Sequence, residues 1–94
     1  MGVFYVQNDD GKVIYIGRSN NIKFEINKLF LKQGKRAQKI QERVEKITFQ
    51  FTGNELFNRL KYYTELETLQ PKYNFKKRKK FQKMNLLIKI LFYN

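Results

Sequence analysis

The sequence contains no cysteine and no histidine, and only eight of its 94 residues are acidic. The absence of cysteine excludes disulfide bonds and thiolate metal sites. The absence of histidine excludes catalysis by imidazole. Zinc binding is excluded as well, because zinc sites in proteins are built mainly from cysteine and histidine.

Long apolar runs are also missing. The longest one, from Leu86 to Tyr93, is interrupted by Lys89 and is too short to span a bilayer. Met1 leads directly into a strand-like segment instead of the basic region and apolar run of a signal peptide. We therefore expect an intracellular protein without membrane contact, cytoplasmic, or nuclear if the host is a eukaryote.

Positive charge, by contrast, is abundant. Twenty Lys and Arg against eight Asp and Glu give a formal net charge of +12. This excess indicates a polyanionic partner, most often nucleic acid and less often an anionic membrane surface. Together with the aromatic content of 16%, it favours nucleic acid as the partner.

Size and composition are those of one folded domain. A chain of 94 residues can bury a single modest core. The apolar fraction of 41%, with nine Phe and six Tyr, is sufficient for that core. We therefore expect a folded chain, although 30% of the residues are charged.

The N-terminal third has the pattern of a β-hairpin followed by a helix. Residues 3–6 and 12–16 are rich in β-branched and aromatic side chains, and a turn sequence that ends in glycine occupies 8–11. Residues 19–21 supply capping oxygens, and apolar residues at helical spacing then predict a helix over 21–33.

A second, short helix is predicted next. Ala37, Ile40 and Val44 lie three and four positions apart, which places one apolar stripe on a helix. Basic residues fill the other faces: Lys35, Arg36, Lys39, Arg43 and Lys46. This helix should therefore have one buried side and a basic exterior.

The apolar period changes to two after residue 46. Residues 47–52 therefore predict a third strand beside the first two, because alternate side chains of a strand share a face. Ile47, Phe49 and Phe51 are expected on the side that faces the core.

A third helix completes the predicted fold. Thr52 and Glu55 have the spacing of a capping box, and the helix that they start should end before Pro71. The order is then β-β-α-α-β-α. It predicts an α/β fold in which a small three-stranded antiparallel sheet is flanked by helices.

Four motifs lie in register over this predicted domain. In chain order they are Gly2-Val3-Phe4, Tyr15-Ile16-Gly17-Arg18-Ser19 followed by Asn21-Ile22, Thr52-Gly53-Asn54-Glu55-Leu56, and Gln70-Pro71-Lys72-Tyr73-Asn74. They resemble the GIY-YIG nuclease superfamily, in particular the nuclease domain of the bacterial excision-repair incision subunit. The resemblance implies a GIY-YIG-like domain over residues 1–76, followed by a basic and then apolar extension over 77–94.

The resemblance implies three retained site residues. Tyr15 matches the tyrosine that contacts or activates the attacking water in the family, and Arg18 matches the basic residue that follows it. Asn74 matches the asparagine that closes the last motif. These three residues are the catalytic candidates.

Three further positions depart from the family's pattern. Phe4, which we expect in the core, lacks the hydroxyl of the family's first-motif tyrosine. Glu25 stands where the family has an arginine on the first helix. Tyr62 stands where the family has its single metal-binding glutamate. A neutral phenol is a poor ligand for a hard cation, and Glu25 adds repulsion to an anionic transition state. We therefore expect no metal cofactor and an inactive or impaired site, unless Glu25 or Glu65 holds Mg²⁺ or Mn²⁺ from a shifted position.

The same side chains can instead have purely structural roles. Tyr15 can be a strand residue that faces a helix, and Asn74 can cap backbone groups. Arg18 is expected to contact phosphate in preference to forming a structural salt bridge. Tyr62 and the adjacent Tyr63 are core residues or a stacking platform for a base.

Nucleic-acid contacts are expected from the site, the second helix and the C-terminal basic run. The residues are Arg18, Lys35, Arg36, Lys39, Arg43, Lys72, Lys76, Lys77, Arg78, Lys79 and Lys80. Phosphate contacts of this kind make binding strongly dependent on salt. The apolar end, from Met84 to Tyr93, either packs on the domain or mediates self-association.

Three functions are open at this point. The leading hypothesis is a nucleic-acid-binding protein with a GIY-YIG nuclease-like fold and a degenerate site. The alternatives are a metal-dependent DNA endonuclease with a relocated carboxylate, and a regulatory module whose basic face binds an acidic protein. Cleavage of supercoiled plasmid separates the endonuclease from the other two.

Overall fold

The predicted hairpin is present in the computed structural model, which describes residues 1–74. It consists of β1 (Gly2–Gln7) and β2 (Val13–Ser19), which pair antiparallel. In the turn between them, Asn8 Oδ1 accepts hydrogen bonds from two backbone N–H groups. Gly11 has a φ of 77°, a left-handed conformation that glycine adopts without strain.

The third strand pairs with the other side of β1. β3 (Lys46–Phe51) is antiparallel to β1, and the strand order is β2-β1-β3. The predicted three-stranded antiparallel sheet is therefore confirmed. Because β1 is central, its Val3 and Val6 are completely buried, one on each face of the sheet.

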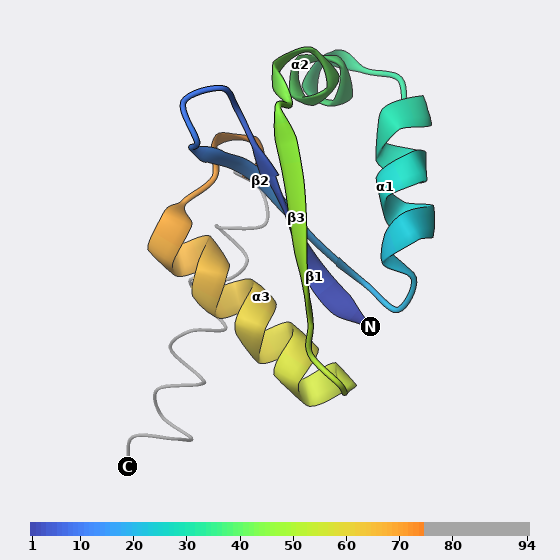
Figure 1. The fold of residues 1–94 in the computed structure, drawn as a ribbon, viewed down its shortest axis with the longest axis vertical. Helices are drawn as coiled ribbons and strands as arrows, with labels where there is room; N and C mark the ends of the chain where they lie inside the picture. Colours follow the sequence, from blue (N-terminus) through green and yellow to red (C-terminus); the bar gives the residue numbers. More distant parts are fainter. Residues whose placement is uncertain (75–94) are drawn as a thin grey trace.

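Helices cover both faces of this sheet (Figure 1). α1 (Ile22–Leu31) and α2 (Lys35–Arg43) lie on one face, and α3 (Glu55–Leu69) crosses the other. A short 3₁₀ turn, Lys72–Asn74, follows α3 and contacts β2. The predicted α/β class and the order β-β-α-α-β-α are confirmed, and α3 ends before Pro71 as expected.

Two apolar clusters form the core, one on each face. The cluster beneath α1 and α2 contains Phe4, Val6, Ile14, Leu29, Ile40 and Tyr73. The cluster beneath α3 contains Val3, Ile16, Tyr62 and Leu66. Burying each of these side chains removes apolar surface from water, which stabilises the fold by about 25 cal/mol per Å². Two residues from the predicted site, Phe4 and Tyr62, are therefore core residues as well.

α1 and α3 each begin after a side-chain cap, and one predicted cap is wrong. Asn21 caps α1 by accepting a hydrogen bond from Phe24 N. The cap of α3 is Asn54, which accepts from Phe57 N, and not Thr52. A cap must directly precede the first helical residue, and α3 begins three positions after Thr52. α1 also ends two residues before the predicted boundary, because the backbone of residue 32 is extended.

The prediction that Phe49 and Phe51 are buried is wrong, although their register is as expected. Phe49 pairs with Phe4 and so lies on the same face of the sheet. The two side chains are nevertheless 55% and 71% exposed, because α1 packs mainly over β2 and β1. Their rings meet edge to face at 5.2 Å and line an open apolar groove of about 440 Å³ beside the start of α1.

The C-terminal predictions fall outside the described residues. These are the domain boundary at 76/77, the basic run Lys76–Lys80 and the apolar end. Within residues 1–74, no helix is both long enough and apolar enough to cross a membrane.

Candidate functional site

A pocket of about 450 Å³ opens where β2, α1 and α3 converge. Its lining residues are Phe4, Tyr15, Gly17, Arg18, Ser19, Asn20, Glu25, Glu55, Tyr62 and Tyr63. Five of the six positions singled out by the family resemblance are among them. The sixth, Asn74, acts on the phenol of Tyr62, which lines the pocket. The fold thus brings together residues that are far apart in the sequence.

The Phe4 ring packs against Gly17, its antiparallel partner on β2. A Cβ atom added at position 17 would overlap the tip of this ring, so a larger residue there would have to displace Phe4. Phe4 is 3% exposed, and its ring centroid lies 6.1 Å from that of Tyr15. The glycine of the second motif therefore has a packing reason in this chain.

Tyr15 lies between two opposite charges. The guanidinium carbon of Arg36 is 5.8 Å from the centroid of the Tyr15 ring, and Glu25 acts on it from α1. Burial raises the pKa of Tyr15; Arg36 opposes this shift and Glu25 adds to it. Because the net shift of the pKa is upward, Tyr15 is a neutral phenol at neutral pH. It can donate a hydrogen bond to an anion.

Arg36 takes a position that the helical pattern alone does not reveal. Its Nη1 also donates a hydrogen bond to the backbone oxygen of Tyr73 at 3.4 Å. A guanidinium therefore stands beside Tyr15, although the position matched to the family's helix arginine is Glu25. The approach of Arg36 depends on how α2 packs against the sheet, which spacing within one helix cannot predict.

Tyr62 is a buried, neutral phenol. Burial raises the pKa of Tyr62 well above its ordinary value, and the neighbouring Tyr15 and Tyr63 add to the shift. Two neighbours oppose this rise of the pKa. They are the positive charge of Arg18, whose guanidinium carbon is 5.9 Å from the ring centroid, and the side chain of Asn74. Tyr62 therefore offers one uncharged oxygen at physiological pH.

Replacing Tyr62 by Phe is expected to flatten the loss of stability at alkaline pH. With its raised native pKa, this phenol stays protonated in the folded state after the unfolded chain has released the proton. The free energy of unfolding then falls by about 1.4 kcal/mol per pH unit above about pH 10. Denaturant unfolding at a series of alkaline pH values measures the slope. A slope in Tyr62→Phe equal to that of the wild type would contradict a buried neutral Tyr62.

The carboxylates around the pocket are not gathered into one cluster. Within residues 1–74, no group of three or more His, Cys, Asp or Glu side chains could hold an ion together. Glu65 pairs with Lys61 at 2.9 Å and lines a different depression. Glu25 lines the pocket, and no ion pair to it is present in this part of the chain. At the position of Tyr62, the neutral phenol does not fit a divalent cation.

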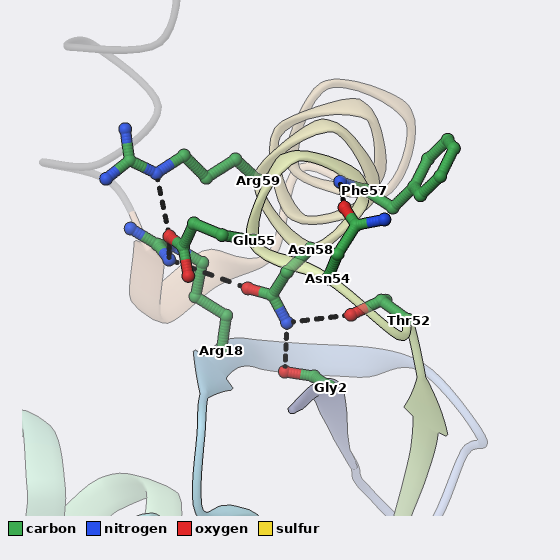
Figure 2. A network of polar contacts seen from close by, with 8 residues as sticks. All are labelled: Gly2, Arg18, Thr52, Asn54, Glu55, Phe57, Asn58 and Arg59. Carbon is green, nitrogen blue, oxygen red and sulfur yellow. Dashed lines mark hydrogen bonds and ion pairs between the residues drawn. The ribbon is translucent and has the colours of Figure 1, made fainter.

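Arg18 is engaged by side chains of α3, as Figure 2 shows. Its Nη1 donates to Glu55 Oε1 at 3.0 Å, and Arg59 Nε donates to the same oxygen at 2.8 Å. Hydrogen bonds from Arg59, and then from Arg18, hold the pKa of Glu55 below its usual value. The sequence favoured a phosphate contact for Arg18 over a salt bridge; in this structure Arg18 forms the salt bridge.

Asn58 is a structural part of the site that the sequence analysis missed. This side chain is 1% exposed, and its Nδ2 donates to Gly2 O at 2.8 Å and to Thr52 Oγ1 at 3.1 Å. Its Oδ1 lies 3.5 Å from Arg18 Nη1 (Figure 2). One buried amide thus joins the start of β1, the β3–α3 connection and Arg18. The available signal was its spacing of four residues from Tyr62, which puts a polar side chain in the buried stripe of α3.

Asn74 binds the outer edge of β2. Its Oδ1 accepts from Ile16 N at 2.8 Å, and its Nδ2 donates to Ile16 O at 2.9 Å. The side chain thereby satisfies both backbone groups of one strand residue, as a neighbouring strand would. The interpretation of Asn74 as a cap of backbone groups agrees with this geometry, which also fixes Asn74 next to Tyr62.

The predicted basic contacts of α2 lie at the surface. Lys35, Arg36, Lys39 and Arg43 are exposed, and so is Lys72 after α3. Of these, Arg36 is held against Tyr15, and Lys72 Nζ is 5.8 Å from the Tyr73 ring centroid. The remaining predicted contacts, Lys76 to Lys80, are outside the described residues.

Comparison with known proteins identifies the fold. The profile of the UvrC-like GIY-YIG domain family matches residues 1–75. Two solved structures of the GIY-YIG N-terminal endonuclease domain of UvrC from Thermotoga maritima are similar to this chain. The first contains its catalytic divalent cation, magnesium; it has a TM-score of 0.72 and 23% identity, over 78% of this chain and 81% of that chain. The second, a point mutant bound to the catalytic divalent cation, has a TM-score of 0.71 and 25% identity, over 78% and 80%. No curated protein matches the sequence.

Proposed function

Because this chain belongs to the family of UvrC-like GIY-YIG domains, we propose that it is a nucleic-acid-binding protein with little or no cleavage activity. DNA is the proposed ligand, inside the cell. The observation that carries this proposal is the buried, neutral Tyr62 at the position that we match to the family's metal-binding glutamate.

Electrostatics support the loss of cleavage. Phosphodiester cleavage adds negative charge to a group that is already anionic, and a divalent cation near the phosphate offsets that charge. Mg²⁺ prefers carboxylate and water oxygens over a neutral phenol. Glu25, at the pocket, adds a negative charge where the family has an arginine. Losing one electrostatic stabiliser costs on the order of 10²–10³ in rate, so losing two leaves little activity.

Charge and shape support binding. The pocket combines Arg18 with aromatic side chains at Tyr15 and Tyr63. α2 brings Arg36 to the Tyr15 ring and exposes Lys35 and Lys39. Basic residues interleaved with aromatic rings are the combination that single-stranded nucleic acids bind, through phosphate contacts and base stacking. The net charge of +12 extends this attraction over the whole molecule.

One observation favours a second candidate function, a metal-dependent DNA endonuclease with a relocated ligand. Glu25 lines the pocket with Tyr15 and forms no ion pair among residues 1–74. Mg²⁺ or Mn²⁺ is often held by one or two carboxylates and several waters, so Glu25 would be the residue to hold it. Bound there, the cation would supply charge stabilisation to the reacting phosphate.

Two measurements on the full-length protein test the proposal. Fluorescence anisotropy with labelled duplex DNA should show binding that weakens steeply as KCl is raised. Supercoiled plasmid incubated with Mg²⁺ or Mn²⁺ should be nicked little or not at all. Metal-dependent nicking that is lost in Glu25→Gln would establish the second candidate instead. No binding to DNA or RNA, together with capture of an acidic protein, would point to a regulatory module.

A further inference from the structure

Two arginines from different elements meet at one carboxylate oxygen. Arg18, at the end of β2, and Arg59, in the second turn of α3, both donate to Glu55 Oε1 (Figure 2). The group is accessible to solvent: the side chains of Arg18, Arg59 and Glu55 are 30%, 57% and 47% exposed. A ligand in solution can therefore reach the two guanidinium groups.

The two guanidinium groups form a site for an anion, and the carboxylate of Glu55 occupies it in this structure. Guanidinium groups match carboxylate and phosphate oxygens in geometry, and both anions accept the same charge-assisted hydrogen bonds. The Glu55 carboxylate thus stands where a phosphate could stand.

We propose that Arg18 and Arg59 form an arginine clamp for one phosphate of a nucleic acid, and that Glu55 is a built-in competitor. This inference rests on the proposed function and names the contact through which the strand would be held. In the free protein Glu55 occupies the clamp, and binding requires a phosphate to displace it. The clamp therefore selects for phosphates that gain further contacts nearby.

The pocket supplies those further contacts. Arg18 and Glu55 line it together with Tyr15, Tyr62 and Tyr63. A phosphate in the clamp brings the adjoining sugar and base to these rings, where stacking adds to the interaction. An isolated phosphate lacks this gain and competes poorly with the tethered Glu55. The ligand chemistry is a phosphate next to an unpaired base, and it can come from an internal phosphodiester or from a strand end.

Displacement of Glu55 should not disturb the fold. Exposed ion pairs contribute little to stability. The cap of α3 is Asn54, which is independent of Glu55. Arg18 also keeps its contact with the buried Asn58 when Glu55 moves away. The guanidinium of Arg18 is therefore positioned for a ligand whether or not the carboxylate is present.

The test is Glu55→Gln in the full-length protein, with Glu65→Gln as the matched control. Each change removes the negative charge of a glutamate of α3 that forms an ion pair with a basic side chain four residues away. Glu65, however, lies outside the pocket. Glu55→Gln is expected to tighten binding of a labelled single-stranded oligonucleotide by about fivefold more than Glu65→Gln does, the scale of one exposed ion pair. The additional gain should vanish when Arg59→Gln is combined with Glu55→Gln.

The source of the phosphate is separated by three probes: an oligonucleotide with a 5′-phosphate, the same oligonucleotide with a 5′-hydroxyl, and a covalently closed single-stranded circle. A gain on all three identifies an internal phosphodiester, and a gain on the first alone identifies a strand end. Equal gains in Glu55→Gln and Glu65→Gln would overturn the clamp and leave the proposed function intact. An absence of binding by wild type and every variant would overturn the proposed function itself.

Discussion

The triple variant Phe4→Tyr, Glu25→Arg, Tyr62→Glu is expected to nick supercoiled plasmid at least about 10² times faster than the wild type in the presence of Mg²⁺. Each change restores a group that the family resemblance implies: a hydroxyl, a guanidinium and a carboxylate. The structure supports the design, because all three positions line one pocket with Tyr15 and Arg18.

Controls and a second readout sharpen this prediction. The control combines Phe4→Tyr and Glu25→Arg with Tyr62→Gln, because glutamine has nearly the size of glutamate without its charge. This control should not recover any nicking activity. Mg²⁺ should raise the melting temperature of the triple variant and leave that of the wild type unchanged, because a buried carboxylate is stabilised by a cation. Equal recovery with Glu and Gln, or nicking that needs no metal, would contradict the prediction.

Arg36 makes a smaller variant informative. Its guanidinium is already 5.8 Å from the Tyr15 ring centroid. If Arg36 supplies the positive charge that Glu25 lacks, the double variant Phe4→Tyr, Tyr62→Glu should recover nearly as much activity as the triple variant. A double variant without activity beside an active triple variant would show that the charge at position 25 is decisive.

Replacing Lys76, Lys77, Arg78, Lys79 and Lys80 by Gln is expected to weaken binding to duplex DNA by at least about 10² at low salt. Each phosphate contact releases about 0.9 counterions, so the slope of log affinity against log salt should become shallower by up to about four and a half. Five of the twenty basic residues lie in this run, which has no acidic neighbour in residues 75–94. Anisotropy titrations at a series of KCl concentrations measure both quantities.

The matched control exchanges Lys for Arg and Arg for Lys in the same five positions. Affinity and salt slope should then stay close to those of the wild type, because non-specific phosphate contacts depend on charge. An unchanged slope in the Gln variant would assign the phosphate contacts to the folded domain, where α2 exposes Lys35, Lys39 and Arg43.

The order of elements was predictable from the sequence because the local signals agree with the fold. The glycine turn, the Asn21 cap and the change of apolar period after residue 46 each specify local backbone structure. The burial of Phe49 and Phe51 was not predictable in the same way. Alternation identifies the face of a strand, but burial of that face requires a helix above it, and α1 covers the neighbouring strands instead.

The candidate site was predictable in its membership and not in its contacts. The family resemblance assigned Phe4, Tyr15 and Tyr62 to one site, and the structure places them around one pocket. The pairing of Arg18 with Glu55 depends on the angle at which α3 crosses the sheet. The role of Asn58 depends on reaching Gly2 at the other end of the chain. Contacts between distant elements of this kind leave no periodic signal in the sequence.

Phe4 and Tyr62 differ in how easily an exchange at each position can be reversed. Phe4 has the shape of a tyrosine without the oxygen at the ring tip, which lies beside Gly17, so exchange for tyrosine keeps the ring and adds one polar atom. The Tyr62 ring belongs to the cluster with Val3, Ile16 and Leu66. Exchange for a shorter, charged side chain empties part of that cluster, which typically costs a few kcal/mol. Exchange at position 62 therefore costs the fold more stability than exchange at position 4, and a cation bound to the new carboxylate would have to offset that cost.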